Sequence, residues 1–165
     1  MGSGKTQVGN LLAQKKEQDF LDLDHVISEE ENMAIPQIFE SFGEIYFRKK
    51  ETEVLKRLLD SDKTFVLALG GGTPCYGKNL QLIKDASKAK LIYLKTELQE
   101  LKSRLLKEKD SRPLIKHLET PEVLEDFIRK HLFERSFYYN QSDLIISTDG
   151  KSPEEISEEI LQSLN

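Results

Sequence analysis

A short run at the start of the chain carries residue types that bind phosphate. It reads Gly2-Ser3-Gly4-Lys5-Thr6 and matches the last five positions of the phosphate-binding loop pattern, GxxxxGK followed by Ser or Thr. Glycines let backbone N–H groups turn toward phosphate oxygens, the lysine reaches the β- and γ-phosphates, and the threonine hydroxyl ligates Mg²⁺. A helix that opens at Thr6 adds its positive end. The run therefore predicts a phosphate site.

Two carboxylates, Asp22 and Asp24, stand in the run FLDLD, at the carboxyl end of a strand predicted at 20–24. Alternate residues of a strand face the same side, and this edge of an open α/β sheet is where ligands bind. One carboxylate could hold Mg²⁺ through water, and the other could accept a hydroxyl proton from a phosphoryl acceptor. The alternative is a solvated strand end at which Asp24 caps a helix that begins at His25.

Glycine and aromatic residues could shape a pocket for that acceptor. Gly70, Gly71 and Gly72 directly follow the apolar run FVLAL, and they would let a substrate approach the backbone closely. The alternative is a flexible turn. Phe39 and Phe47 could wall a small-molecule pocket, although aromatic residues at such positions also serve as core.

Arginines at three places could bind an anion, because the guanidinium fork suits carboxylate and phosphate. Arg48 and Glu51 lie three positions apart on a predicted helix, so Glu51 could orient Arg48 by an ion pair. Arg135 comes late in another helical stretch, and Arg112 precedes Pro113 in a charged segment. The alternative for each arginine is an ordinary surface ion pair.

Alternating strands and helices must position these residues. Short apolar runs predict strands at 20–24, 65–69, 91–94 and 144–147, and helical patterns occupy 6–16, 36–59, 78–86, 97–107, 121–137 and 153–164. This alternation predicts an α/β three-layer sandwich with a parallel sheet, in a single domain that spans 1–165. The charged segment at about 108–119 is expected to be a mobile flap or lid.

Composition narrows the class of protein. The chain has 165 residues, of which 38% are hydrophobic and 32% charged, with a net charge of −5, as in a soluble globular domain. The acidic balance argues against a general nucleic-acid binder, and no apolar run reaches the ~20 residues of a membrane span. One cysteine excludes an intramolecular disulfide. We expect a cytoplasmic protein that acts as a monomer on a small molecule.

Together the motifs make the chain resemble the shikimate kinase family over nearly its whole length. The resemblance rests on GSGKT at 2–6, DLD at 22–24, IFESFGE to FRKKE at 38–51, LGGGT at 69–73, SRPLI at 111–115 and ERSFYY at 134–139. It implies a phosphate-loop fold like that of nucleoside-monophosphate kinases, with a five-stranded parallel sheet in the order 2-3-1-4-5. It also implies ATP-dependent phosphorylation of the 3-hydroxyl of shikimate, a step of aromatic amino-acid biosynthesis.

The resemblance gives roles to residues on the nucleotide side. Lys5 resembles the lysine of the phosphate cradle, and ATP contacts are expected along the loop and at Gln7. Thr6 resembles the Mg²⁺ ligand, with Asp22 reaching the ion through water. Arg112 resembles the lid arginine that swings onto the ATP phosphates, so Lys5 and Arg112 are expected to be catalytic.

On the acceptor side, Asp24 resembles the catalytic residue that binds and deprotonates the shikimate hydroxyl. Arg48 and Arg135 resemble the pair that grips the shikimate carboxylate, with Glu51 as the partner that orients Arg48. The remaining expected substrate contacts are Gly70, Gly71, Gly72, Phe39 and Phe47.

One part of the family pattern is not in this sequence. The full loop motif has a further glycine two positions before Met1 and a strand that leads into the loop, which is the central strand of the implied sheet. We therefore expect Met1 to be an internal methionine of a longer product. Alternative functions are another small-molecule phosphate-loop kinase, of the gluconate or nucleoside-monophosphate type, and a truncated non-catalytic nucleotide-binding module.

Overall fold

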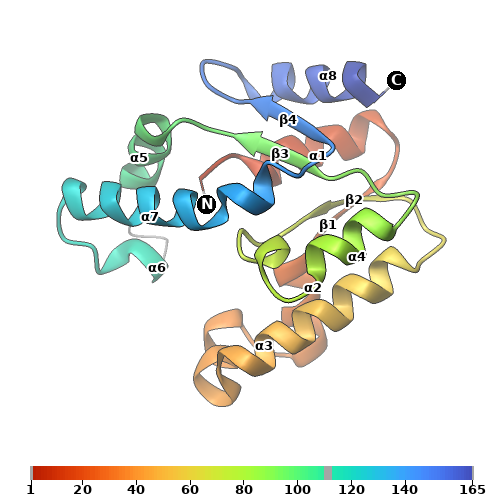
Figure 1. Cartoon of the computed structure of the whole chain (residues 1–165), viewed down its shortest axis with the longest axis horizontal. Coiled ribbons are helices and arrows are strands. Elements are labelled where there is room, and N and C mark those ends of the chain that lie inside the picture. The colour runs from red at the N-terminus through yellow and green to blue at the C-terminus, as the bar shows by residue number, and fades with distance from the viewer. Residues whose placement is uncertain (1, 110–112, 165) are drawn as a thin grey trace.

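Strands and helices alternate along the chain in the computed structural model, which describes residues 2–109 and 113–164 (Figure 1). Each predicted strand and helix is present, with ends shifted by no more than two residues. In chain order the elements are α1 (Lys5–Lys15), β1 (Asp19–Asp22), α2 (Leu23–Glu31), α3 (Ile35–Leu59), β2 (Phe65–Ala68), the 3₁₀ turn η1 (Thr73–Cys75), α4 (Asn79–Asp85), β3 (Ile92–Lys95), α5 (Leu98–Lys107), α6 (Pro113–Lys116), α7 (Pro121–Tyr139), β4 (Leu144–Ser147) and α8 (Pro153–Leu164).

The first strand ends earlier than the sequence indicates. It stops at Asp22, and α2 begins at the next residue, so Asp24 lies in the first turn of a helix and not on the strand. The expectation that alternation along a strand aligns the two carboxylates is therefore wrong. The alternative, in which Asp24 is the cap, is wrong as well, because the side chain of Asp22 accepts from the backbone N–H groups of Asp24 and His25. Asp22 ends the strand because its short carboxylate caps the helix.

Helix α3 is broken once. Gly43 has φ 79° and ψ 172°, a conformation that is essentially restricted to glycine, so the predicted single helix is two helices joined at a kink. The segment before the kink carries Phe39, and the segment after it carries Phe47, Arg48 and Glu51. The kink thus sets the angle between the aromatic residues and the arginine of the expected acceptor pocket.

The strands pair in parallel, as predicted. Strand β1 pairs with β2, with Asp22 opposite Ala68, and β3 pairs with β4, with Lys95 opposite Ser147. These are two separate two-stranded sheets, and no strand in the described part of the chain joins β2 to β3. The pairs correspond to the outer pairs of the implied order 2-3-1-4-5. A cavity of about 760 Å³, lined by residues of α1, β2 and β3, lies between them.

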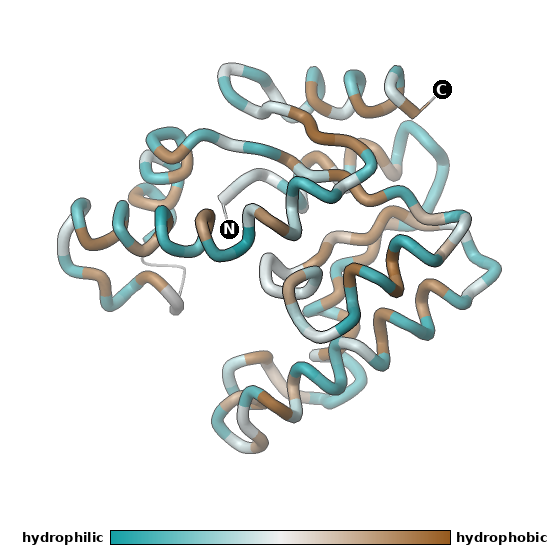
Figure 2. The backbone as a smooth tube through the Cα atoms, in the orientation of Figure 1, coloured by the Kyte–Doolittle hydropathy of each residue, from teal (hydrophilic) through white to brown (hydrophobic). Residues whose placement is uncertain are grey.

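Helices lie on both sides of the strands (Figure 1), and apolar residues recur along helices and strands alike (Figure 2). Three apolar clusters join these elements. One cluster packs α2 and α3 with α4, a second packs α1 and α8 against β3 and β4, and a third joins α5, α6 and α7. Leu23, Ile27, Leu55 and Leu105 are fully buried within these clusters. None of the helices in the described ranges has both the length and the apolar character needed to cross a membrane.

Candidate active site

The phosphate-loop residues stand where α1 begins. The N-cap is Gly4, with φ 83°, and no side chain caps the helix, so the first backbone N–H groups keep their capacity to bind an anion. Gly2 also has a positive φ, of 72°. Lys5 opens the helix and is half-buried, while Thr6 and Gln7 are exposed. This is the backbone geometry that the glycine pattern predicts, with the helix starting one residue earlier.

Helix α5 supports this loop, which the sequence does not indicate. Arg104 Nη1 donates to the carbonyl oxygen of Gly2 at 3.5 Å, and Arg104 Nε donates to Glu100 Oε1 at 2.7 Å. A Cβ on Gly2 would stand 3.1 Å from Leu105 Cγ, so the loop lies directly on α5. Arg104 therefore ties the backbone of the phosphate loop to α5.

Asp24 lies between the two sides of the site. Burial raises the pKa of its carboxyl above the ordinary value, and the nearby charges of Asp22 and Glu51 raise it further, while Lys5 and Arg48 act in the opposite direction. A Cβ on Gly70 would stand 3.4 Å from Asp24 Oδ1. The carboxylate thus adjoins the glycine run and lies within electrostatic range of Lys5, and its raised pKa makes it a stronger proton acceptor.

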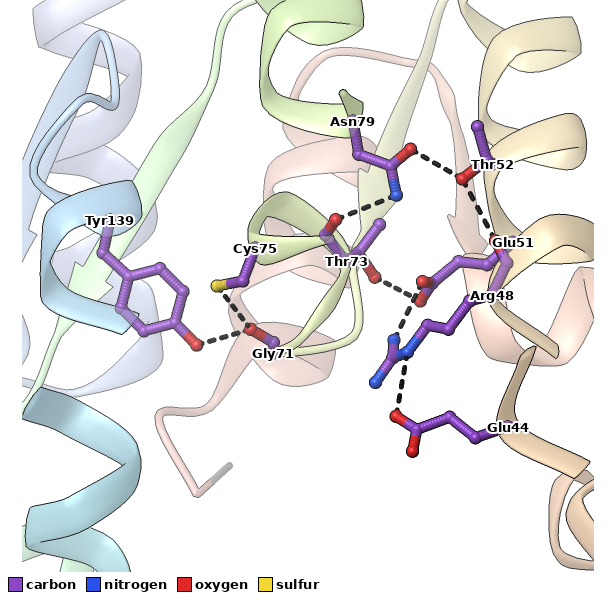
Figure 3. A network of polar contacts seen from close by, with 9 residues as sticks. All are labelled: Glu44, Arg48, Glu51, Thr52, Gly71, Thr73, Cys75, Asn79 and Tyr139. Atoms are coloured by element: carbon purple, nitrogen blue, oxygen red, sulfur yellow. Dashed lines mark hydrogen bonds and ion pairs between the residues drawn. The ribbon is translucent and has the colours of Figure 1, made fainter. Parts of the chain in front are cut away.

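Arg48 is held by carboxylates on its own helix (Figure 3). Its Nη1 atom donates to Glu51 Oε2 at 2.9 Å, and its Nε atom lies 3.5 Å from Glu44 Oε1. The side chain of Glu51 is only 1% exposed, so this is a largely buried ion pair. Arg48 Nη2 lies 2.8 Å from the point where a Cβ on Gly72 would stand. The prediction that Glu51 pairs with Arg48 is confirmed.

Arg135 reaches the glycine run from α7. Its Nη1 atom lies 2.8 Å from the point where a Cβ on Gly71 would stand. From the same helix, the hydroxyl of Tyr139 donates to the Gly71 carbonyl oxygen at 2.7 Å. Two guanidinium groups from distant segments therefore meet at consecutive glycines. The missing Cβ atoms are what permits this approach, because an ordinary side chain at either position would collide with them.

The phosphate loop and the glycine run open onto one cavity. Ser3 and Lys5 line it together with Gly70, Gly71 and Arg135. The two sites that the sequence indicates separately are thus continuous in space. Most of the cavity's other lining residues are apolar side chains from the elements on either side, such as Leu12, Val66 and Leu94, so the cavity is mainly the space between the two sheets.

The two predicted pocket aromatics differ in burial. Their rings are in contact, with centroids 4.7 Å apart. Phe47 is buried in the cluster of α2, α3 and α4, which is the core alternative, although Arg48 lies 5.5 Å from its ring centroid. Phe39 is 37% exposed and can face a ligand.

The expected lid is described in part. Arg112 lies outside the described residues. In the second half of the segment, Ile115 is fully buried and Leu118 nearly so, and both pack with α5 and α7. Closure or opening of this half would have to move or break that packing.

The donors for a divalent cation are oxygen atoms. The Thr6 hydroxyl and the Asp22 carboxylate are hard ligands of the kind that Mg²⁺ prefers. Asp22 uses Oδ1 in the cap of α2, so Oδ2 is the oxygen that would accept from a metal-bound water. Among residues 2–109 and 113–164, no group of three or more His, Cys, Asp or Glu could hold a metal by itself. This donor set fits an ion carried mainly by nucleotide phosphates and water.

Comparison with known proteins decides the family. A sequence model of the family described as shikimate kinase matches residues 1–165. The chain belongs to the shikimate kinase family. The shikimate kinase of Flavobacterium psychrophilum is 48% identical over 161 residues, which cover 97% of this chain and 92% of the relative. That of Flavobacterium johnsoniae is 42% identical, and the match covers 99% of this chain and 94% of the relative.

Solved structures of the family have the same fold. A shikimate kinase from Acinetobacter baumannii, in complex with shikimate, superposes with a TM-score of 0.85 at 35% identity, covering 99% of this chain and 88% of the other. A shikimate kinase from Bacteroides thetaiotaomicron gives a TM-score of 0.84 at 29% identity, with coverages of 99% and 92%. The prediction of a phosphate-loop α/β fold is confirmed.

Several polar residues of the candidate site in this shikimate kinase family member had no signal of their own in the sequence. Thr73 and Asn79 are fully buried and hydrogen-bonded beside the glycine run, and Tyr139 contacts Gly71. Thr73 directly follows the glycines in a turn, where threonine is an ordinary residue, and Asn79 is the first residue of α4, where a polar residue is equally ordinary. Tyr139 belongs to the FERSFYY run, and only the spacing of four from Arg135 places the two on one helix face.

Proposed function

We propose that this member of the shikimate kinase family transfers the γ-phosphoryl group of ATP to the 3-hydroxyl group of shikimate, within aromatic amino-acid biosynthesis. The observation that carries the proposal is the meeting of Arg48 and Arg135 at consecutive glycines beside Asp24. Two guanidinium groups away from the phosphate loop call for an acceptor that is itself an anion, such as a carboxylate. The relative solved in complex with shikimate, at 35% identity, supports that choice of acceptor.

In the proposed reaction, Arg48 and Arg135 bind the carboxylate of the acceptor and so orient its ring. Asp24 takes the proton of the 3-hydroxyl as the oxygen attacks the γ-phosphorus. One P–O bond forms to the acceptor, the bond between the γ-phosphorus and the β,γ-bridging oxygen breaks, and ADP leaves. Phosphoryl transfer needs positioning and charge neutralisation more than covalent help from the protein, which suits this set of residues.

On the donor side, Lys5 and the N–H groups of the loop would bind the β- and γ-phosphates, and Arg112 would add positive charge from the lid. Mg²⁺, held by Thr6 and through water by Asp22, would neutralise charge on the same phosphates when bound. Closure of the segment at about 108–119 would exclude water, which otherwise competes as acceptor. We include in the proposal that the chain acts as a cytoplasmic monomer without nucleic-acid or membrane partners.

The test is release of ADP in a coupled assay with shikimate, gluconate and AMP as acceptors. We expect turnover with shikimate alone, because neither a gluconate chain nor a nucleotide presents a carboxylate and ring hydroxyls in the same arrangement. Turnover only with gluconate or AMP would show that shikimate is not the acceptor. ATP binding in a direct titration without turnover of any acceptor would favour a non-catalytic nucleotide-binding module.

A further inference from the structure

A closed ring of hydrogen bonds joins the glycine run to the helix that carries Arg48 (Figure 3). Starting from Arg48, the ring passes through Glu51, Thr73, Asn79 and Thr52 and returns to the backbone of Arg48. Its members come from α3, η1 and α4. Of these residues only Arg48 and Glu51 carry charge. Thr73 and Asn79 are neutral but fully buried, so their polar side chains need another reason.

The link from Thr73 to Glu51 is the tightest of the ring. Thr73 Oγ1 donates to Glu51 Oε1 at 2.6 Å, and both residues are almost completely buried, at 0% and 1% exposure. The other oxygen of Glu51 accepts from Arg48 Nη1 at 2.9 Å. Each oxygen of the Glu51 carboxylate therefore accepts from a different donor. Because Thr73 fixes one oxygen, the second oxygen presents a defined direction to the guanidinium.

Thr73 also closes the glycine turn. Its backbone N–H donates to the Gly70 carbonyl oxygen at 3.0 Å, and the residue before it is Gly72, against which Arg48 Nη2 lies. One residue therefore fixes the turn through its backbone and the arginine through its side chain. Thr73 thus links the glycine run to the carboxylate that holds the guanidinium.

Asn79 and Thr52 hold Thr73 in place from the other side. Asn79 Nδ2 donates to the Thr73 carbonyl oxygen at 2.9 Å, and the Thr52 hydroxyl donates to Asn79 Oδ1 at 2.8 Å. The Thr73 carbonyl can only accept, so the amide nitrogen must face it and the amide oxygen must face Thr52. The Thr52 hydroxyl has a single hydrogen, which it shares between Asn79 Oδ1 and the Arg48 carbonyl oxygen, 3.0 Å away.

We infer that Thr73 is a positioning residue of the acceptor site, which acts through Glu51 to aim Arg48 at the acceptor carboxylate, with Asn79 and Thr52 bracing it. The inference rests on the proposed role of Arg48. Its physical basis is preorganisation: an arginine already held in its binding geometry loses less conformational freedom when the ligand arrives. Thr73 contacts neither ATP nor the reacting atoms in this account.

The first experiment replaces the hydroxyl and keeps the shape. Thr73→Val is expected to raise the KM for shikimate by about tenfold, the effect of losing a hydrogen bond to a charged group, with the KM for ATP changed by less than about twofold. Thr73→Ser, which keeps the donor, is expected to stay near the wild-type value. If the valine variant does not fold, Thr73→Ala is expected to raise the KM for shikimate in the same way.

A matched control removes a different buried threonine hydroxyl. Thr148 is fully buried, and its Oγ1 lies 2.7 Å from Thr96 Oγ1, at a distance in sequence from the acceptor residues. Thr148→Val is expected to lower stability without changing the KM for shikimate. If Thr148→Val and Thr73→Val raise that KM equally, the effect is general loosening and the inference is wrong.

A second arm tests whether Thr73 acts through Arg48. In the background Arg48→Ala with Glu51→Gln, which removes the ion pair without leaving a buried charge, Thr73→Val is expected to add nothing to the KM for shikimate. In the background Arg135→Ala it is expected to keep its full effect. A full effect in the first background overturns the inference. If that background itself leaves the KM for shikimate unchanged, the proposed role of Arg48 fails instead.

Discussion

Asp22 caps the helix whose first turn carries Asp24: its Oδ1 atom accepts from the Asp24 backbone N–H at 3.0 Å and from that of His25 at 3.4 Å. The carboxylate proposed to approach the metal is therefore tied to the backbone of the residue proposed to take the proton. One oxygen of Asp22 has a structural role, and the other is the one that would serve the proposed ion. The two roles can be separated by substitution.

Asparagine and alanine at position 22 should have different effects. Asp22→Asn keeps an amide oxygen that caps the helix, so we expect a melting temperature near the wild-type value, with more Mg²⁺ needed for half-maximal activity. Asp22→Ala loses the cap as well, which costs about 1 kcal/mol of stability. Thermal unfolding and activity against free Mg²⁺ measure the two effects. An unchanged Mg²⁺ response in Asp22→Asn would remove Asp22 from the metal site.

Asp24→Asn should separate catalysis from nucleotide binding. An amide of the same shape cannot take the hydroxyl proton, so we expect turnover to fall by about 10²- to 10⁴-fold, the usual contribution of a positioned general base. Titration of ATP against the variant should give nearly the wild-type dissociation constant. Retained turnover would mean that another group accepts the proton.

The same substitution makes a prediction about stability and pH. The pKa of Asp24 is raised above its ordinary value of 3.8, mainly by burial, so the folded protein binds this proton more tightly than the unfolded chain does. The ionised carboxylate therefore destabilises the fold at neutral pH, and this penalty disappears as the pH falls below 3.8. Asp24→Asn should raise the melting temperature at pH 7, and the gain should vanish near pH 3. A gain that does not change with pH would rule out this origin.

Local patterns predicted most of the fold, and tertiary contacts explain what they missed. Apolar runs and the GSGKT motif are local signals, so the strands and the start of α1 could be placed from the sequence alone. The strand was extended past Asp22 because alternation continues to Asp24, whereas the cap ends it. The break at Gly43 was missed because a single glycine is compatible with a helix. Which strands pair, and where the cavity lies between them, depends on segments that are far apart in the sequence. The periodicity of apolar residues carries no information on such contacts.

In the candidate site, too, local spacing predicted some contacts, while contacts between distant residues were missed. Arg48 and Glu51 were paired correctly because a spacing of three on a helix is a local rule. The links from Thr73 to Glu51 and from Tyr139 to Gly71 join residues 22 and 68 positions apart. No helix or strand period relates such positions, so the sequence pattern assigned no role to Thr73 or Tyr139, although both belong to quoted motifs.

Gly72→Ala tests the close approach of Arg48 without straining the backbone. Gly72 has φ −86° and ψ −16°, which alanine adopts freely, but the new Cβ would stand 2.8 Å from Arg48 Nη2. The flexible guanidinium should move, so we expect a raised KM for shikimate with little loss of stability. The control is Gly150→Ala, where φ is 69° and no atom lies within 4 Å. It should lose about 1–2 kcal/mol of stability to backbone strain and keep the wild-type KM. A raised KM for shikimate in Gly150→Ala with an unchanged KM in Gly72→Ala would contradict the placement of Arg48 at the acceptor.

The ion pair of Arg48 and Glu51 allows stability and acceptor binding to be separated. Arg48→Ala leaves a carboxylate that is 1% exposed without its cation, so we expect a loss of about 3 kcal/mol of stability together with weak acceptor binding. Adding Glu51→Gln removes the buried charge, and the melting temperature should recover most of that loss. The KM for shikimate should stay high, because the guanidinium that binds the carboxylate is still missing. Recovery of both quantities in the double variant would show that Arg48 supports the fold and does not bind the acceptor.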